Sequence, residues 1–152
     1  MLKLDESLLG QRSEPVVREV ERGAIRKFAA ALGLDDPIHT AVEAARARGY
    51  RDMVAPPTFA VTLLPFEAPG LRLPKAGVLH GEQEFEWGAA ICAGDRLTVT
   101  GWVEDVKTRS GAGGKMHIIS VASEAVNQDG ERVFRAKAVL IVTEEVEHAV
   151  GR

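Results

Sequence analysis

Four runs of β-branched and other apolar residues, partly alternating with polar ones, fill the second half of the chain. They cover residues 78–87, 96–109, 115–127 and 132–143. Such runs are typical of strands that bury one face of a sheet. The segments between them are short and contain glycine: residues 93–95, 110–114 and 128–130. Because connections of this kind are typical of hairpins, we expect four long antiparallel strands.

The first half of the chain is typical of helices and turns. Residues 13–20 contain three valines among charged residues and predict a short strand or an extended segment. Residues 22–32 carry apolar side chains at helical spacing, and Gly33 after them is a residue type that commonly ends a helix. The alanine-rich residues 41–48 predict a short exposed helix that ends at Gly49.

An uncharged segment follows two prolines in the middle of the chain. Pro57 can open a helix, because the first helical position needs no N–H donor. Residues 58–64 carry no charge, so the helix they continue should be enclosed rather than surface-lying. Residues 66–76 predict a loop within the same domain. One early strand, helices and then four strands indicate a single α+β domain over residues 1–152, with a sheet curling over the apolar helix.

Composition narrows the class of protein. The chain has 152 residues, 45% of them hydrophobic, which is enough for one domain with a substantial core. A formal net charge of −3 gives no positive field for DNA or RNA, so nucleic acid is not an expected partner. Cys92 is the sole cysteine, which excludes an intrachain disulfide and fits a reducing compartment.

Targeting signals are not apparent in the sequence. Residues 1–10 lack the basic start and continuous apolar stretch of a signal peptide. The longest apolar run, residues 138–142, falls far short of the roughly 18 residues needed to cross a bilayer. We therefore expect a cytoplasmic protein with no membrane partner.

Two carboxylates lie close to an imidazole on a turn that contains proline. Asp35, Asp36 and His39 fall within residues 33–39. Histidine exchanges protons near neutral pH and a nearby carboxylate can orient its ring, so these residues are the candidate catalytic group. The alternative is that the aspartates cap the turn or the next helix while His39 packs on the surface.

The start of the apolar helix is the candidate substrate-binding site. Pro57, Thr58 and Phe59 lie there, and free backbone N–H groups at a helix start can polarise a carbonyl oxygen. The alternative is ordinary core burial.

Five basic residues could bind the phosphates of a ligand or the surface of an acidic protein. Alternatively, each of them belongs to a solvated charged face. They are Arg46, Arg48, Arg51, Arg72 and Lys75.

Three segments resemble the superfamily of MaoC-like dehydratases and (R)-specific enoyl hydratases in their order and spacing. They are residues 20–29, residues 36–39 with the sequence Asp-Pro-Ile-His, and residues 55–59 with the sequence Ala-Pro-Pro-Thr-Phe. The last segment, together with His-Gly-Glu-Gln-Glu-Phe-Glu at residues 80–86, resembles the N-terminal-domain branch, the fatty-acid-synthase-type dehydratases.

This resemblance covers nearly the whole chain and implies both a fold and a reaction. The fold is a hot-dog fold, in which a bent antiparallel sheet wraps around a central helix and two sheets pair side by side in a dimer. The reaction, in fatty acid metabolism, is the reversible hydration of a trans-2-enoyl thioester to the (3R)-3-hydroxyacyl thioester, carried on coenzyme A or acyl carrier protein. No metal or redox cofactor is implied.

The sequence departs from the pattern of the active family members at two places. His39 matches the histidine of their Asp-x-Asn-Pro-x-His motif, but Leu34 stands at the position of the aspartate and Asp36 at that of the asparagine. Asp35 could replace the aspartate only if the turn slips by one residue. Pro57 and its neighbour Pro56 replace a His-Gly sequence and remove backbone donors, which weakens the expectation of carbonyl contacts there.

Three hypotheses follow. The first is a dehydratase or hydratase subunit in which His39 transfers protons, with Asp36 or Asp35 as its orienting partner. The second is a non-catalytic hot-dog subunit that shapes the acyl tunnel of a heteromeric dehydratase, which Leu34 favours. The third is a hot-dog thioesterase, against which residues 58–64 argue because they contain no carboxylate.

Overall fold

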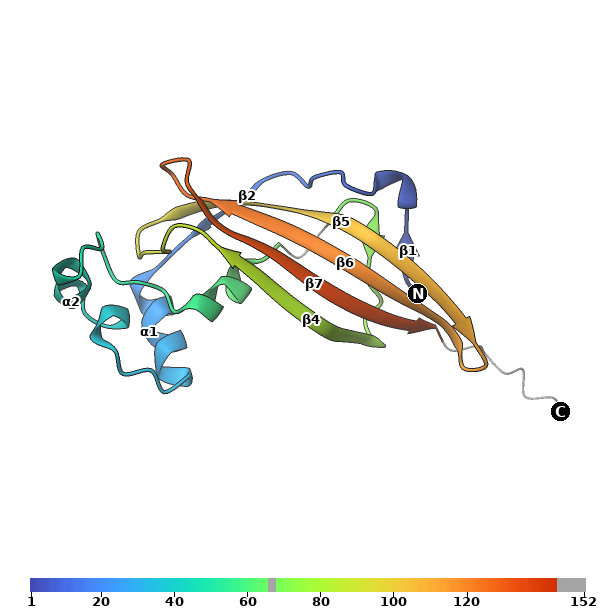
Figure 1. Cartoon of the computed structure of the whole chain (residues 1–152), viewed down its shortest axis with the longest axis horizontal. Helices are drawn as coiled ribbons and strands as arrows, with labels where there is room; N and C mark the ends of the chain where they lie inside the picture. The colour runs from blue at the N-terminus through green and yellow to red at the C-terminus, as the bar shows by residue number, and fades with distance from the viewer. Residues whose placement is uncertain (66–67, 145–152) are drawn as a thin grey trace.

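Five antiparallel strands form the main sheet of the computed structural model, which describes residues 1–65 and 68–144. Their order across the sheet is β2-β5-β6-β7-β4, and the long strands curve together along the molecule (Figure 1). Their bounds are Val16–Glu19 (β2), Val78–Trp87 (β4), Arg96–Gly111 (β5), Gly114–Val126 (β6) and Arg132–Glu144 (β7). The four long strands expected from the sequence are confirmed, with ends within two residues of those predicted.

The two α-helices lie at one end of the sheet (Figure 1). The two predicted early helices are confirmed as α1, Arg22–Ala31, and α2, Val42–Ala47. After α1, Gly33 adopts the left-handed conformation with φ of 68°, as a helix-ending glycine does. Together with the bent antiparallel sheet, these helices confirm the α+β fold class.

Several short elements complete the chain. In the predicted loop, residues 66 and 67 lie outside the described residues, and the rest includes a two-residue strand that pairs with the N-terminal segment. The remaining elements are β1, Lys3–Leu4, β3, Leu71–Arg72, and the 3-10 helices η1, Glu6–Leu8, η2, Pro37–His39, and η3, Pro57–Leu63.

The prediction of a hairpin between β4 and β5 is wrong, because these two strands are not neighbours in the sheet. β4 pairs with β7 at one edge, whereas β5 lies between β2 and β6. The connection leaves β4 along β7, where the Gly88 N–H donates to the Val133 carbonyl at 3.0 Å. It then pairs with the middle of the chain through an isolated bridge between Val54 and Cys92. A short glycine-containing connection therefore crosses the end of the sheet here instead of turning back.

The predicted apolar helix exists, but it is a 3-10 helix and is not enclosed within this chain. Phe59, Ala60 and Leu63 are buried, and Phe59 packs edge-on against Phe28 of α1 at 5.5 Å between ring centroids. Val61, on another side of η3, is 46% exposed. A helix that buries only one face needs apolar residues only along that face. The opposite side of η3 is also uncharged, and this predicted its burial as well. Within the described part of the chain, however, nothing covers that side.

Two hydrophobic clusters cover the inner face of the sheet. The first joins α1 and η3 to the strands, with Ile25, Phe59 and Phe134 among its buried members. The second lies beneath the N-terminal segment and includes Ile119 and Val142. The inner face is thus apolar along its length, as one face of a half-covered sheet requires.

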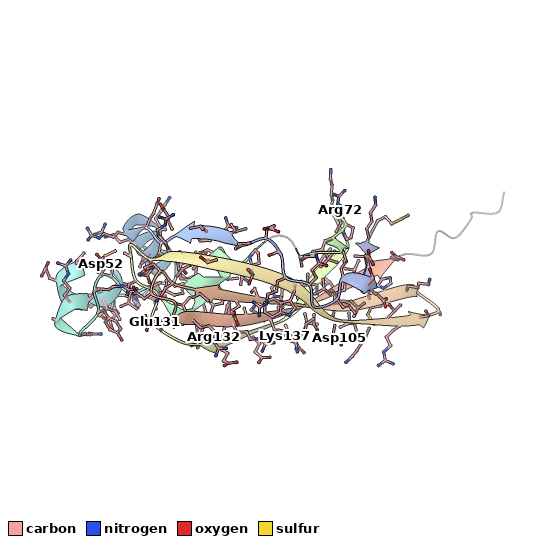
Figure 2. All side chains as sticks on the ribbon, turned by 90° about the horizontal axis from the view of Figure 1, so that it is seen from above. Asp52, Arg72, Asp105, Glu131, Arg132 and Lys137 are labelled. Atoms are coloured by element: carbon pink, nitrogen blue, oxygen red, sulfur yellow. The ribbon has the colours of Figure 1, made fainter. Side chains whose placement is uncertain are left out.

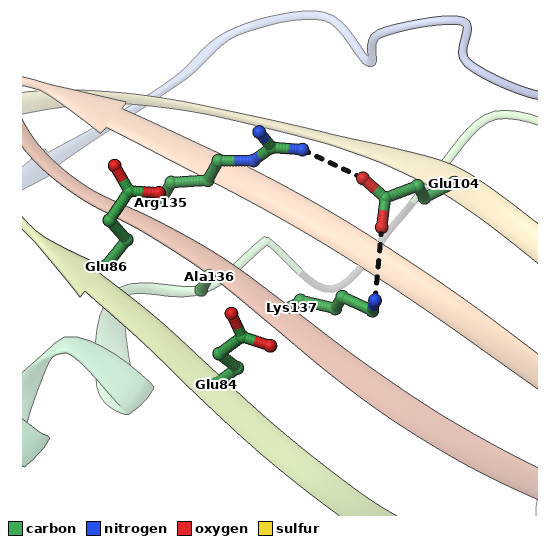
Figure 3. Close-up of a pocket in the computed structure, with 6 residues that line it drawn as sticks. All are labelled: Glu84, Glu86, Glu104, Arg135, Ala136 and Lys137. Atoms are coloured by element: carbon green, nitrogen blue, oxygen red, sulfur yellow. Dashed lines mark hydrogen bonds and ion pairs between the residues drawn. The ribbon is translucent and has the colours of Figure 1, made fainter.

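The outer face of the sheet carries charged side chains. In Figure 2, Arg132, Lys137 and Asp105 lie along one side of the sheet, while Arg72 lies on the other. Arg135 and Lys137 both contact Glu104, at 2.8 and 3.6 Å, beside a shallow depression of about 200 Å³ (Figure 3). These exposed cross-strand pairs contribute little stability individually.

A buried carboxylate ties the sheet to the segment before η3. Asp95 is 1% exposed and accepts hydrogen bonds from the Cys92 N–H at 2.9 Å, from the Gln128 side chain at 3.1 Å, and from Arg51. Arg51 also contacts the exposed Asp129 at 3.0 Å. Because a buried carboxylate needs partners for its lone pairs, this group fixes the β4–β5 connection against the turn after β6.

We expect Asp95→Ala to lower the free energy of unfolding by about 3 kcal/mol, because it leaves the buried Cys92 N–H without its acceptor and removes one of the two carboxylates that hold Arg51. Asp129→Ala is the matched control, since it removes the exposed carboxylate from the same arginine and should cost less than about 1 kcal/mol. Urea denaturation of both variants measures the difference. Equal losses would contradict the structural role given to Asp95.

Candidate functional site

The turn that carries His39 is held by one aspartate. Asp36 precedes η2 and accepts a hydrogen bond from the Ile38 N–H at 3.1 Å through Oδ1. Its other oxygen, Oδ2, accepts one from Arg48 at 2.9 Å. Asp36 is therefore an N-cap and an ion-pair partner, as the alternative interpretation of the aspartates proposed.

The His39 imidazole is buried and fixed by a backbone carbonyl. The residue is 9% exposed, and Nδ1 lies 2.7 Å from the carbonyl oxygen of Val54. A carbonyl oxygen can only accept, so Nδ1 carries the hydrogen of this bond. In the neutral ring, Nε2 then keeps a free lone pair and can act as a base. The expectation that His39 packs on the surface is thus wrong.

The carbonyl that orients His39 belongs to a segment held on both sides. The Val54 N–H donates to the Ile38 carbonyl at 2.9 Å, which closes a second link to the same turn. On the other side, the Ala55 N–H donates to the Ile91 carbonyl at 2.8 Å, and the Ala93 N–H donates to the Met53 carbonyl at 2.8 Å. Val54 therefore has little freedom to move, and neither has the ring that it holds.

Neither aspartate of the turn contacts the imidazole. The two carboxylate oxygens of Asp36 accept hydrogen bonds from the Ile38 N–H and from Arg48. These hydrogen bonds lower the pKa of the Asp36 carboxyl, and the one from the Ile38 backbone has the largest effect. Asp35 is exposed and makes no hydrogen bond or ion pair within residues 1–65 and 68–144. Leu34, at the position of the family aspartate, is 39% exposed, and its N–H donates to the Ala29 carbonyl. The partner of the His39 ring is thus the Val54 carbonyl and neither of these two carboxylates.

The start of η3 offers one open backbone donor. Pro57 has no N–H, and the Phe59 N–H donates to the Pro56 carbonyl at 2.9 Å. Thr58 is exposed, and its N–H makes no hydrogen bond within the described part of the chain. Thr58 follows Val54 by four residues, so at most about 14 Å of extended chain separates it from the carbonyl that holds His39. This donor and the His39 ring lie at the same end of the molecule.

Three of the five basic residues suggested for phosphate binding are used within the chain. Arg46 contacts Glu43 at 3.9 Å, Arg48 pairs with Asp36, and Arg51 pairs with Asp95 and Asp129. Arg72 and Lys75 make no such pair among the described residues. Most of the suggested basic group is therefore already paired with carboxylates of the same chain.

Other reactive groups of the described residues lie outside this site. Burial raises the pKa of the Cys92 thiol, which disfavours the thiolate that a nucleophile needs. No cluster of three or more His, Cys, Asp or Glu side chains that could hold a metal occurs within residues 1–65 and 68–144. None of the helices in the same residues is long and apolar enough to cross a membrane.

The sequence predicted His39 but could not predict its hydrogen-bond partner. A backbone carbonyl leaves no side-chain signature, so nothing about Val54 in the sequence points to the ring. The pairing of Arg51 with the buried Asp95 was also missed, because the two residues are far apart in the chain and each is a common surface residue type.

Comparison with known proteins identifies a family and several relatives. Residues 7–136 match the protein family described as FAS1-like, dehydratase domain region. A UPF0336 protein of Saccharopolyspora erythraea is 39% identical over 157 residues, which cover 99% of this chain and 98% of that protein.

Solved structures of similar shape have related descriptions. The C-terminally truncated HadBC complex of Mycobacterium tuberculosis, a 3R-hydroxyacyl-ACP dehydratase, contains a chain with a TM-score of 0.72 and 29% identity, over 88% of this chain and 96% of that one. A MaoC-like dehydratase of Rhodospirillum rubrum has a TM-score of 0.68 and 23% identity, over 91% and 94% of the two chains. The second likeness shows the fold alone.

The charge of Asp36 should make stability depend on pH. Because its pKa in the folded protein lies below the ordinary value of 3.8, the carboxylate adds stability above that value and loses it as the pH falls through the lower, folded pKa. We expect Asp36→Asn to be less stable than wild type near about pH 6, with the difference shrinking towards about pH 2. Urea denaturation at both pH values measures this, and Asp35→Asn is the control, with little effect at either. A pH-independent difference would contradict the charge effect.

Proposed function

Since the chain belongs to the family described as FAS1-like, dehydratase domain region, we propose that it is a subunit of a hydro-lyase that acts on acyl thioesters. The reaction is dehydration of a (3R)-3-hydroxyacyl thioester, or hydration of the trans-2-enoyl thioester in reverse. The fold is the hot-dog fold of the MaoC-like dehydratases and (R)-hydratases, as the resemblance of the sequence implied. The observation that carries the proposal is the buried His39 ring, with Nδ1 fixed and Nε2 available.

His39 transfers the proton in this proposal. Dehydration removes one proton from C2 and the hydroxyl from C3, and the hydroxyl needs a proton to leave as water. Neutral Nε2 can take the first proton and return it to the leaving hydroxyl, so the ring ends the cycle as it began. The bond from Nδ1 to the Val54 carbonyl keeps the required tautomer and ring orientation.

Thr58 and its neighbours bind the thioester in this proposal. The open Thr58 N–H donates to the thioester carbonyl, which gains negative charge when C2 loses its proton. Pro57 contributes no donor, so the contact is weaker than a pair of N–H groups would give. The buried Phe59 forms part of the apolar wall beneath.

The carrier of the acyl chain is coenzyme A or acyl carrier protein. The HadBC complex, whose chain is 29% identical to this one, acts on hydroxyacyl-ACP according to its name. That likeness supports a carrier-linked acyl chain as the substrate class. No resident metal or redox group takes part in the proposed reaction.

A second candidate function is a non-catalytic subunit of a heteromeric dehydratase. Leu34 at the aspartate position and the use of Asp36 as a cap leave His39 without a carboxylate to stabilise its protonated form. A partner subunit with a complete Asp–His pair would then perform the chemistry, while this chain shapes the acyl tunnel.

Either function involves pairing with another hot-dog subunit. Solved neighbours include the HadBC complex and the ChsH1–ChsH2 complex, which support association with a second such subunit. The edge strand β4 is ten residues long and carries an exposed Leu79 and Trp87, and an unprotected edge of this kind pairs readily with another strand. We propose that β4 pairs with the β4 edge of an identical or related chain.

We expect the purified chain, alone or with a co-expressed partner, to hydrate crotonyl-coenzyme A, and His39→Ala to lower kcat by about 100-fold or more because the base is lost. Loss of the enoyl absorbance measures the rate. Leu34→Asp, at an exposed position, should raise the rate if His39 lacks only its carboxylate. Wild-type Tm in His39→Ala excludes unfolding as the cause.

The other hypotheses give different results in the same assay. Activity that appears only with a partner, and survives His39→Ala, would overturn catalysis by this chain and support the non-catalytic subunit. Release of free coenzyme A would instead identify a thioesterase.

A further inference from the structure

A β-bulge in the edge strand determines which side chains reach the inner face of the sheet. The register of β4 against β7 shifts between His80 and Glu82, so Gly81 is the extra residue. Beyond the bulge, Gln83 lies opposite Ala138 and Phe85 opposite Ala136, a buried residue of the first cluster. Gln83 therefore projects towards the apolar inner side, where a polar side chain is not expected.

The amide of Gln83 has a fixed orientation. Its Nε2 lies 3.3 Å from the carbonyl oxygen of Glu84 and 3.3 Å from that of Lys137. Both of these atoms can only accept hydrogen bonds, so the nitrogen must face them and Oε1 must face away. Since Glu84 and Lys137 are paired residues of β4 and β7, the amide lies over the ladder between these strands, not beyond the open edge.

The remaining atom of this amide is buried without a partner. Oε1 is buried in the free chain, and no group of residues 1–65 and 68–144 donates a hydrogen bond to it. A buried acceptor left unpaired is costly, and it is uncommon enough in native proteins to require an explanation. The donor is therefore not among the described residues, and a bound molecule is one source of it. Because the amide lies over the inner face of the sheet, the backbone of a strand added at the edge is poorly placed to donate a hydrogen bond to Oε1.

We propose that Gln83 is a substrate-positioning residue whose Oε1 accepts a hydrogen bond from an O–H or N–H group of the bound acyl thioester. This inference rests on the proposed function, which supplies the class of ligand. An alkyl chain has no such donor. The donor is either the 3-hydroxyl of the acyl group or an amide N–H of the pantetheine arm.

The two sources of the donor predict different selectivity. The 3-hydroxyl is present in the hydroxyacyl thioester and absent from the enoyl and saturated thioesters. The pantetheine amides are present in all of them and in coenzyme A itself. A contact to the hydroxyl therefore distinguishes the two sides of the reaction, whereas a contact to the arm strengthens every ligand equally.

Gln83→Met tests the proposal, because methionine has similar length and no hydrogen-bonding amide. Isothermal titration measures the binding of 3-hydroxybutyryl-, crotonyl- and butyryl-coenzyme A, in a His39→Ala background that prevents turnover. We expect binding about 5- to 10-fold weaker, the loss of one neutral hydrogen bond. The loss affects the hydroxyacyl ligand alone if the hydroxyl is the donor, and all three equally if the arm is.

The free protein provides an independent measurement. The carbonyls of Glu84 and Lys137 belong to the strand ladder, so they keep a partner when Gln83 is replaced. The replacement also removes an unpaired acceptor, and the Tm should therefore be unchanged or raised. Gln83→Leu is the second variant, and Glu84→Gln, on the outer face, is the control with unchanged affinity. Unchanged binding of all three ligands by Gln83→Met, or a lowered Tm with unchanged affinity, would overturn the proposal while leaving the proposed function intact. If the protein with native Gln83 binds none of the ligands, both fail.

Discussion

The site depends on one constraint, the double attachment of Val54 to the turn of His39. The Val54 N–H and carbonyl both bond to that turn, at Ile38 and at the His39 ring. The neighbouring residues Met53 and Ala55 bond to the connection that crosses the end of the sheet. One short segment thus orients the imidazole, closes the end of the core and sets the point from which η3 begins. Buried backbone groups that must all be paired leave few other arrangements for this region.

The nature of the ring's partner determines what the site can do by itself. A carbonyl fixes the tautomer and direction of an imidazole, but it carries no full charge with which to stabilise the protonated ring. A carboxylate would do both. In this chain the carboxylate of Asp36, three residues before His39, is instead the cap of the turn and the partner of Arg48. Orientation and charge stabilisation are therefore separated in this chain.

The sequence predicted the local structure better than the arrangement. Alternation located β4 over the same residues that the structure shows, and helical spacing with Gly33 located α1. The order of the strands was not predictable from the short β4–β5 connection, because its length permits both a hairpin and a crossing. At the candidate site, the motif singled out His39, whereas its bond to the Val54 carbonyl and the burial of Gln83 depend on contacts between residues far apart in the chain.

The bulge at Gly81 has a consequence for how this strand can vary. Side chains of a regular strand alternate between its two faces, so residues an odd number of positions apart point to opposite faces. Val78 and Phe85 are an odd number of positions apart, yet both pack against the core, because the bulge adds one residue between them. Deleting one residue there would turn half of the strand over, sending either the aromatic half or the valine half to the outer surface. A substitution in β4 changes one side chain. A change of length at this point instead reverses the direction of several side chains at once. The length of the strand is therefore under a stricter constraint than its composition.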